Sequence, residues 1–138
     1  ANMMLVEASR TLKLMDFGIA RIADASKTKT GMVLGTPSYM SPEQLAGRRV
    51  DGRSDIFSLA VTLYQLLSGG LPFQADSMAT LMFKIANEPH APLSVVCPGL
   101  PADLAEILDR AMTKDPDLRY PRAGELSAAL RRILTQMG

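Results

Sequence analysis

Cysteine and histidine are almost absent from this chain, whose 138 residues contain one of each, Cys97 and His90. A single cysteine excludes an internal disulfide framework and fits a reducing compartment. One cysteine with one histidine cannot build a zinc site of the usual Cys and His ligands. Both residues lie in a proline-rich loop at 89–101, so we interpret Cys97 as an inert thiol and His90 as a surface side chain.

An excess of charge of one sign is also missing. Fifteen Lys and Arg residues face fourteen Asp and Glu residues, so the formal net charge is +1. A broad nucleic-acid-binding surface needs clustered basic charge, and we therefore expect no nucleic-acid partner. Hydrophobic residues make up 47% of the chain and charged residues 21%. This balance is typical of a soluble globular protein, and the length suits one domain or part of one.

Long hydrophobic runs are lacking as well. Residues 56–75 carry no formal charge, but only 56–67 form an apolar core before Gly69, Gly70 and Pro72 interrupt the stretch. A membrane span needs about 20 predominantly apolar residues, so a buried core helix is expected instead. The chain starts without Met and without a basic-then-apolar leader. We therefore expect a fragment with no signal peptide and a cytoplasmic location, any membrane anchor of the full-length protein lying elsewhere.

The local pattern predicts a mainly helical chain with one small β-hairpin near its N-terminus. A short apolar run, a polar turn and an alternating run predict the hairpin over 3–15. Polar residues 19–40 show no clear period and predict a long loop, which inside a compact domain is usually functional. Ser41 and Pro42 are typical of an N-cap and a first helical position, and they predict a short helix over 42–46.

A longer helix is predicted to start near Ser54 or Asp55, both of which are good N-caps. Its apolar residues cover every face, and a helix of this kind is expected to be buried on all sides. Three later segments, at 78–85, 104–112 and 126–137, show the i, i+3, i+4, i+7 spacing of one-faced helices. The sequence therefore predicts a helical bundle around one buried central helix.

Five motifs follow one another in a defined order. They are Asp16-Phe17-Gly18, Gly35-Thr36-Pro37-Ser38-Tyr39, Ser41-Pro42-Glu43, Asp55 at the start of an apolar helix, and Asp115-Pro116-Asp117-Leu118-Arg119-Tyr120. Each motif alone is weak, since short peptides recur by chance. Their order resembles the C-terminal lobe of the protein kinases, specifically the eukaryotic-like serine/threonine kinases of bacteria. The resemblance covers essentially the whole chain.

This resemblance implies a fold class and an activity. The chain is expected to be the helical C-lobe of the α+β kinase fold, a partial kinase domain over 1–138. Its implied parts are the hairpin at 3–15, an activation segment at 16–43 and a helical subdomain at 44–138. The implied reaction transfers the γ-phosphate of ATP to serine and threonine hydroxyls of proteins, with ATP and Mg²⁺ as cofactors.

Three residues near the N-terminus carry the implied cofactor contacts. Asp16 matches the Asp that binds the metal and the nucleotide, and Asn2 matches the Asn that binds a second metal ion. Both supply the hard oxygen ligands that Mg²⁺ prefers. For Asn2 the alternative is a frayed terminal residue. Met4 falls where the family places an apolar floor under adenine, although ordinary core packing would select the same residue.

The implied activation segment contains candidate phosphorylation sites. Thr28 and Thr30 are the strongest candidates, followed by Ser26, because a phosphate can order such a loop against Arg side chains. The alternative is a solvated polar loop that carries no modification. Thr36 matches the Thr that supports the catalytic machinery in serine/threonine kinases, and it favours serine/threonine over tyrosine specificity.

Three further residues have implied structural roles. Glu43 and Arg119 match a buried ion pair that ties the end of the activation segment to the helical core. Asp55 matches the Asp that holds the backbone of the catalytic loop, although a plain N-cap would look the same in sequence. Phe57 and Ala60 stand where the family has Trp and Gly, and we interpret both replacements as tolerated.

Several parts of a complete kinase fall outside the 138 residues. By resemblance, the Gly-rich loop, the ATP-binding Lys and its Glu partner belong to an N-terminal lobe, and the catalytic Asp to a position five residues before Asn2. We therefore expect no catalytic base in this chain, no activity of the chain alone, and an apolar patch on the central helix. The expected partners are protein substrates, the N-terminal lobe and a second copy for autophosphorylation. The alternative is a pseudokinase that scaffolds partners, but Asn2, Asp16 and Thr36 favour the enzyme.

Overall fold

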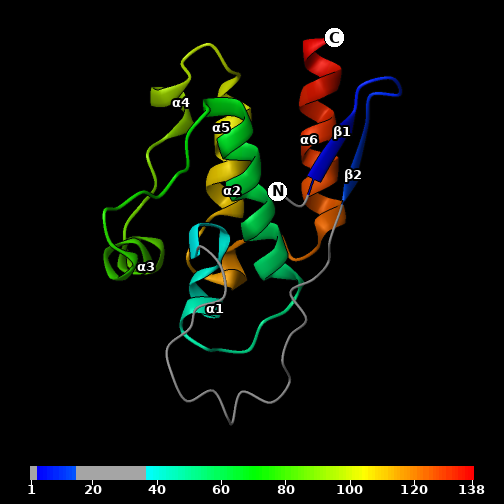
Figure 1. Ribbon diagram of the computed structural model, residues 1–138. Coiled ribbons are helices and arrows are strands. Elements are labelled where there is room, and N and C mark those ends of the chain that lie inside the picture. The colour runs from blue at the N-terminus through cyan, green and yellow to red at the C-terminus, as the bar shows by residue number, and fades with distance from the viewer. Residues whose placement is uncertain (1–2, 15–36) are drawn as a thin grey trace. The chain divides into compact units, whose positions relative to one another are not determined.

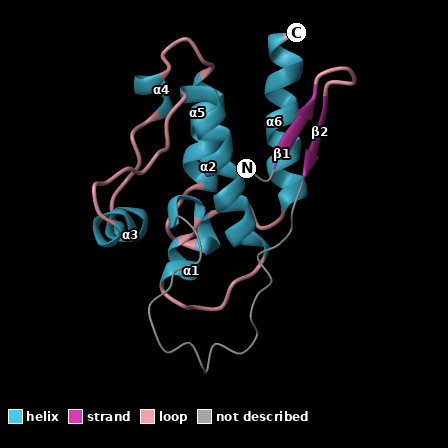
Figure 2. Ribbon diagram, viewed as in Figure 1, coloured by secondary structure: helices cyan, strands magenta, loops and turns pink. Residues whose placement is uncertain are grey.

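The computed structural model describes residues 3–14 and 37–138. The chain divides into two compact units, residues 1–32 and 33–138. The first contains a two-stranded sheet and the second a set of helices, as coloured in Figure 2. This mainly helical architecture with one small sheet confirms the predicted fold class.

The sheet is an antiparallel hairpin. Strand β1 spans Met3–Val6 and β2 spans Thr11–Leu14, with Met3 opposite Leu14 and Val6 opposite Thr11. Arg10 closes the connecting turn with a φ of 49°, in the left-handed region that turns often require. The predicted hairpin is therefore present.

The helical unit contains eight helical segments in its described part (Figure 1). In chain order they are η1 (Pro37–Tyr39), α1 (Pro42–Leu45), α2 (Gly52–Ser68), α3 (Met78–Asn87), α4 (Leu93–Val96), α5 (Ala102–Ala111), η2 (Pro116–Leu118) and α6 (Ala123–Met137). Helix α2 packs against α4, α5, α6 and η1, while α3 packs against α1 and η1. Helix α2 is therefore the centre of this unit.

The start of α2 lies earlier than the sequence predicts. Asp51, not Ser54 or Asp55, is the N-cap, and its carboxylate accepts a hydrogen bond from the backbone N–H of Arg53. Ser54 and Asp55 lie in the first turn instead. Asp51, Ser54 and Asp55 all have side chains that can cap a helix, so residue type alone does not identify the N-cap. The helix ends at Ser68, and Gly69, whose φ is 78°, follows as a left-handed C-cap.

Helix α2 is not buried on all sides. One face carries Phe57, Ala60 and Val61, which are fully buried. The opposite face exposes Leu59 by 40% and Leu66 by 69%. The prediction of burial on every side is therefore wrong for the described unit, because no described helix covers this second face.

The three one-faced helices are present, but their stripes are only partly buried. In α3 the stripe buries Leu81 and Ile85 and leaves Met78 exposed. In α6 it buries Leu126 and Ile133, while the last turn exposes Leu134 and Met137. Leu81, Ile85 and Leu126 share one core, which also contains these residues: Ile56, Phe57, Tyr64, Phe73, Leu93, Leu108, Met112 and Tyr120.

The proline-rich loop at 89–101 contains structure that the sequence pattern missed. Helix α4 interrupts the loop and buries Leu93. His90 is not a surface side chain, because only 12% of it is exposed and its Nε2 lies 2.7 Å from Asp109 Oδ1. Its ring meets those of Tyr64 and Phe73 edge-on. Cys97 is half-buried, and its thiol donates to the carbonyl of Leu67.

No helix among the described residues has the length and hydropathy needed to cross a bilayer.

Candidate functional site

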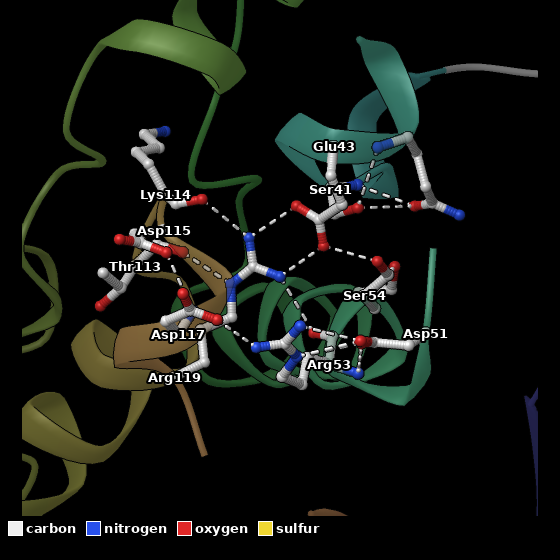
Figure 3. A network of polar contacts seen from close by, with 12 residues as sticks. Ser41, Glu43, Asp51, Arg53, Ser54, Thr113, Lys114, Asp115, Asp117 and Arg119 are labelled. Carbon is white, nitrogen blue, oxygen red and sulfur yellow. Dashed lines mark hydrogen bonds and ion pairs between the residues drawn. The ribbon is translucent and has the colours of Figure 1, made fainter. Parts of the chain in front are cut away.

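A buried ion pair joins α1 to the segment just after η2 (Figure 3). Arg119 Nη1 donates to Glu43 Oε1 at 2.6 Å, and Nη2 donates to Glu43 Oε2 at 2.8 Å. The Glu43 side chain is 7% exposed and that of Arg119 is fully covered. This two-point geometry matches the planar fork of a guanidinium to a carboxylate. It fixes α1 against the core of the helical unit.

The sequence around Glu43 explains why α1 begins where it does. Ser41 caps the helix: its hydroxyl accepts from the backbone N–H of Gln44, and the Gln44 side chain accepts from the backbone N–H of Ser41. Pro42 follows at the first helical position, where a missing N–H costs nothing. Glu43 therefore falls in the first turn, where the helix dipole also favours a carboxylate.

The remaining donors of Arg119 bind backbone carbonyls from two other segments. Its Nε donates to Thr113 at 2.6 Å, Nη2 to Lys114 at 3.1 Å and Nη1 to Arg53 at 3.1 Å. Arg119 therefore connects α1, the start of α2 and the loop after α5. Among the described residues, no buried side-chain nitrogen or oxygen lacks a hydrogen-bond partner.

The electrostatics of Glu43 follow from these contacts. Burial alone would raise the pKa of this carboxyl, but hydrogen bonds from Arg119 and Ser54 outweigh it and lower the pKa to about 2. The Ser54 hydroxyl donates to Glu43 Oε1 at 2.5 Å. Glu43 is therefore ionised at neutral pH, and the pair is a charged one.

Aromatic rings extend the site into the core. The guanidinium carbon of Arg119 lies 5.0 Å from the centroid of the Phe57 ring. Phe57 stacks on Phe73 with centroids 6.4 Å apart, and Lys114 Nζ lies 4.1 Å from the centroid of Phe73. Each of the two stacked rings thus has a cation near it, an arrangement that the negative faces of aromatic rings favour. Phe57 occupies a fully buried position.

Sequence reasoning missed an exposed pair of contacts beside the buried one. Arg53 pairs with Asp51 at 2.9 Å and with Asp117 at 2.6 Å, which joins the start of α2 to η2. Acidic and basic residues of this kind are common on surfaces, and only the fold brings positions 53 and 117 together. Exposed pairs contribute little to stability.

Two hydrogen bonds attach η1 to α2, and these too gave no sequence signal. The hydroxyl of Tyr39 donates to Gln65 Oε1 at 2.5 Å, and the hydroxyl of Ser58 donates to the backbone carbonyl of Tyr39 at 2.6 Å. Together with the hydrogen bond from Ser54 to Glu43, they attach residues 39–43 to α2 at points from its first turn to its last.

Most of the residues with implied catalytic or regulatory roles lie outside the described ranges. They are Asn2, Asp16, Ser26, Thr28, Thr30 and Thr36. Met4 lies on β1 and is half-exposed, and Asp55 is exposed in the first turn of α2. Within 3–14 and 37–138, no three His, Cys, Asp or Glu side chains lie close enough together to hold a metal ion.

The described parts thus define a mainly helical protein in which a Ser-Pro-Glu segment is locked by a buried arginine 76 positions later. A family model described as the protein kinase domain matches residues 1–132. The chain belongs to this family.

Individual relatives carry more specific names. The chain is 44% identical over 136 residues to the serine/threonine-protein kinase PknB of Mycobacterium tuberculosis, a match that covers 96% of this chain and 22% of that protein. It is 42% identical over 127 residues to the serine/threonine-protein kinase Pkn1 of Myxococcus xanthus, covering 91% of this chain and 18% of Pkn1. A probable serine/threonine-protein kinase of Streptomyces coelicolor is 41% identical over 138 residues, with coverage of 97% and 20%. The chain spans about a fifth of the length of these relatives.

Proposed function

We propose that this chain is the C-terminal lobe of a serine/threonine protein kinase, which transfers the γ-phosphate of ATP to serine and threonine hydroxyls of protein substrates. The observation that carries the proposal is the match of the protein kinase domain over residues 1–132. The names of the relatives support the serine/threonine class. Within the lobe, we assign the activation segment to 16–43 and the helical subdomain to 44–138.

The proposed cofactor contacts rest on the chemistry of two side chains. Asn2 and Asp16 offer an amide oxygen and a carboxylate, which are the hard oxygen ligands that suit Mg²⁺ beside a nucleotide. When bound, the metal ion neutralises charge on the phosphate oxygens. Met4 would contribute apolar surface under the adenine ring. Thr36 precedes η1 directly and would support the catalytic machinery beside the substrate.

The described residues would act by holding the substrate side of the site in place. Phosphoryl transfer depends mainly on positioning and on electrostatic stabilisation. The Glu43–Arg119 pair and the Tyr39–Gln65 hydrogen bond fix the end of the proposed activation segment to α2. Asp55, exposed near the start of the same helix, is free to hold the catalytic-loop backbone of a complete domain.

The proposal extends to regulation and to partners. Thr28, Thr30 and Ser26 are the proposed phosphorylation sites, by a second copy of the protein or by another kinase. The N-terminal lobe would supply the remaining ATP contacts and the catalytic base. Residues 1–138 alone are therefore proposed to be inactive. The proposed location is cytoplasmic for this part of the protein.

The experiment compares the full-length gene product with its Asp16→Ala variant, using Mg²⁺, ATP and a general protein substrate. We expect phosphoserine and phosphothreonine in the wild type and a loss of at least about a hundredfold in the variant. Asp103→Ala, an exposed acidic residue on α5, is the matched control and should retain full activity. Equal rates for wild type and Asp16→Ala would refute the assignment of Asp16. No transfer by the wild type would favour a scaffold instead.

A further inference from the structure

Lys114 makes an unusual set of contacts in the loop between α5 and η2. Its Nζ donates to the backbone carbonyl of Ile85 at 2.5 Å and to that of Lys84 at 3.4 Å. Both carbonyls belong to the last turn of α3, where helix carbonyls have few partners of their own. A cation at this end of a helix is also favoured by the helix dipole. Lys114 therefore binds the C-terminal end of α3.

The position of Lys114 is set from two sides. Beneath its ammonium group, 4.1 Å away, lies the ring of Phe73, which is only 3% exposed. Its backbone carbonyl accepts a hydrogen bond from Arg119 Nη2, the same nitrogen that binds Glu43. Lys114 thus connects α3 directly to the Glu43–Arg119 pair.

Helix α3 contacts the chain on both sides of Ser41, at η1 and at α1. It packs against η1 and α1, which form the C-terminal end of the proposed activation segment. It has two other polar attachments: Ser77 caps its N-terminus, and the side chain of Lys84, in the last turn, donates to the carbonyl of Gln74 in the loop before the helix. The C-terminal end of α3 is therefore held by Lys114 from the loop after α5, by the hydrogen bond from Lys84 to Gln74 and by the burial of Ile85.

We propose that Lys114 is a positioning residue for the protein substrate, because it fixes the α3 surface next to the end of the activation segment. This inference rests on the proposed kinase function, and it assigns Lys114 no contact with ATP or with the transferred phosphate. Its loss should weaken the use of protein substrate and leave the use of ATP unchanged.

The positive charge of Lys114 depends on pH, and this dependence allows a second test of its role at the end of α3. Burial and the nearby positive charge of Arg119 lower the pKa of Lys114 to about 8, while Glu88 acts in the opposite direction. The other ionisable groups nearby are His90, which contacts the same Phe73 ring, and Asp109, which pairs with His90. The ammonium charge at the end of α3 is therefore lost over a range of pH in which an arginine keeps its charge.

The experiment uses the full-length gene product as wild type, Lys114→Arg and Lys114→Met. Methionine matches the length of lysine but cannot donate, whereas arginine keeps the charge and the donors. In Lys114→Met we expect hydrogen exchange at the end of α3 to be about tenfold faster, and KM for protein substrate to rise about tenfold. KM for ATP should stay within about twofold, and Lys114→Arg should restore both properties.

The pH comparison separates positioning from general stability. From about pH 7 to about pH 9, the wild type should lose about threefold in α3 protection relative to Lys114→Arg, measured against intrinsic exchange rates. Parallel pH profiles for the two proteins would overturn the inference. If Lys114→Arg fails to fold, the comparison of Lys114→Met with wild type still decides.

The remaining outcomes distinguish this inference from the proposed function. Unchanged α3 exchange in Lys114→Met overturns the inference alone, provided that the wild type transfers phosphate. Faster α3 exchange with an unchanged KM for protein substrate also overturns it. A wild type without transfer activity overturns the proposed function and, with it, the substrate role of Lys114.

Discussion

The guanidinium of Arg119 lies over the ring of Phe57, its carbon 5.0 Å from the ring centroid, while two of its nitrogens bind Glu43. One side chain thus uses its flat face for packing and its edge for hydrogen bonding. Because a lysine has neither the plane nor enough donors, Arg119 has no conservative replacement at this position.

Removing one member of the buried pair should be strongly destabilising. In Arg119→Met, the carboxylate of Glu43 loses its buried cation, and we expect a loss of about 3–5 kcal/mol in the free energy of unfolding. Urea unfolding measures this loss. The control is Arg53→Ala, which breaks two exposed pairs and should cost less than about 1 kcal/mol.

The double variant Glu43→Met with Arg119→Met sharpens that test. It removes both charges, so it should be less destabilised than the sum of the two single variants. It should not return fully to wild-type stability, because the carbonyls of Arg53, Thr113 and Lys114 lose their donor. A strictly additive double variant would contradict a direct interaction.

Acid should weaken the fold through Glu43. The pKa of this carboxyl is about 2 in the folded protein, below its ordinary value of 4.5. Between these values the unfolded chain binds more protons than the folded one, so stability falls as the pH drops. The contribution is complete above the ordinary value and amounts to about 3 kcal/mol.

Unfolding measured across the acid range checks this expectation. Glu43→Gln cannot titrate, and its stability should depend less on pH in this range than that of the wild type. The same slope in both proteins would show that other carboxyl groups cause the acid sensitivity.

The start of α2 gives a smaller and more local prediction. Asp51→Ala removes the N-cap and should cost about 1 kcal/mol. Asp55→Ala, its matched control in the first turn, should cost less than about 0.5 kcal/mol, because only the helix dipole is affected. Thermal or urea unfolding of the two variants distinguishes them, and equal losses would contradict Asp51 as the cap.

The exposed face of α2 should bind hydrophobic dye. Leu59 and Leu66 are exposed apolar side chains on the otherwise central helix. We expect residues 1–138 to bind such a dye strongly, and the variant Leu59→Ser with Leu66→Ser to bind it less at unchanged stability. Val95→Ser, an exposed apolar residue on α4, serves as the control. Equal dye binding in all three proteins would contradict a distinct apolar surface on α2.

Much of the fold could be predicted because its signals are local. An apolar run before residues 7–10 and an alternating run after them predict the hairpin, and Ser41 with Pro42 predicts the start of α1, since the determining contacts span only a few residues. The spacing of apolar residues likewise predicts α3, α5 and α6. In each case, the residues that determine the element are close together in the sequence.

The remainder depends on contacts between distant segments. His90 is largely covered because it contacts Tyr64, Phe73 and Asp109, and none of these lies within 15 positions of it. The contacts of Lys114 could not be predicted for the same reason, since the carbonyls that it binds on α3 lie 29 and 30 positions away in the chain. A polar residue in a loop gives no local sign of the pocket that will receive it.

The separation of Glu43 from Arg119 has a consequence for biosynthesis. Glu43 leaves the ribosome 76 residues before its partner, so α1 has no buried cation to bind until almost all of the helices have been made. A nascent chain that stalls before Arg119 therefore lacks the guanidinium that holds the Ser-Pro-Glu segment in the folded protein.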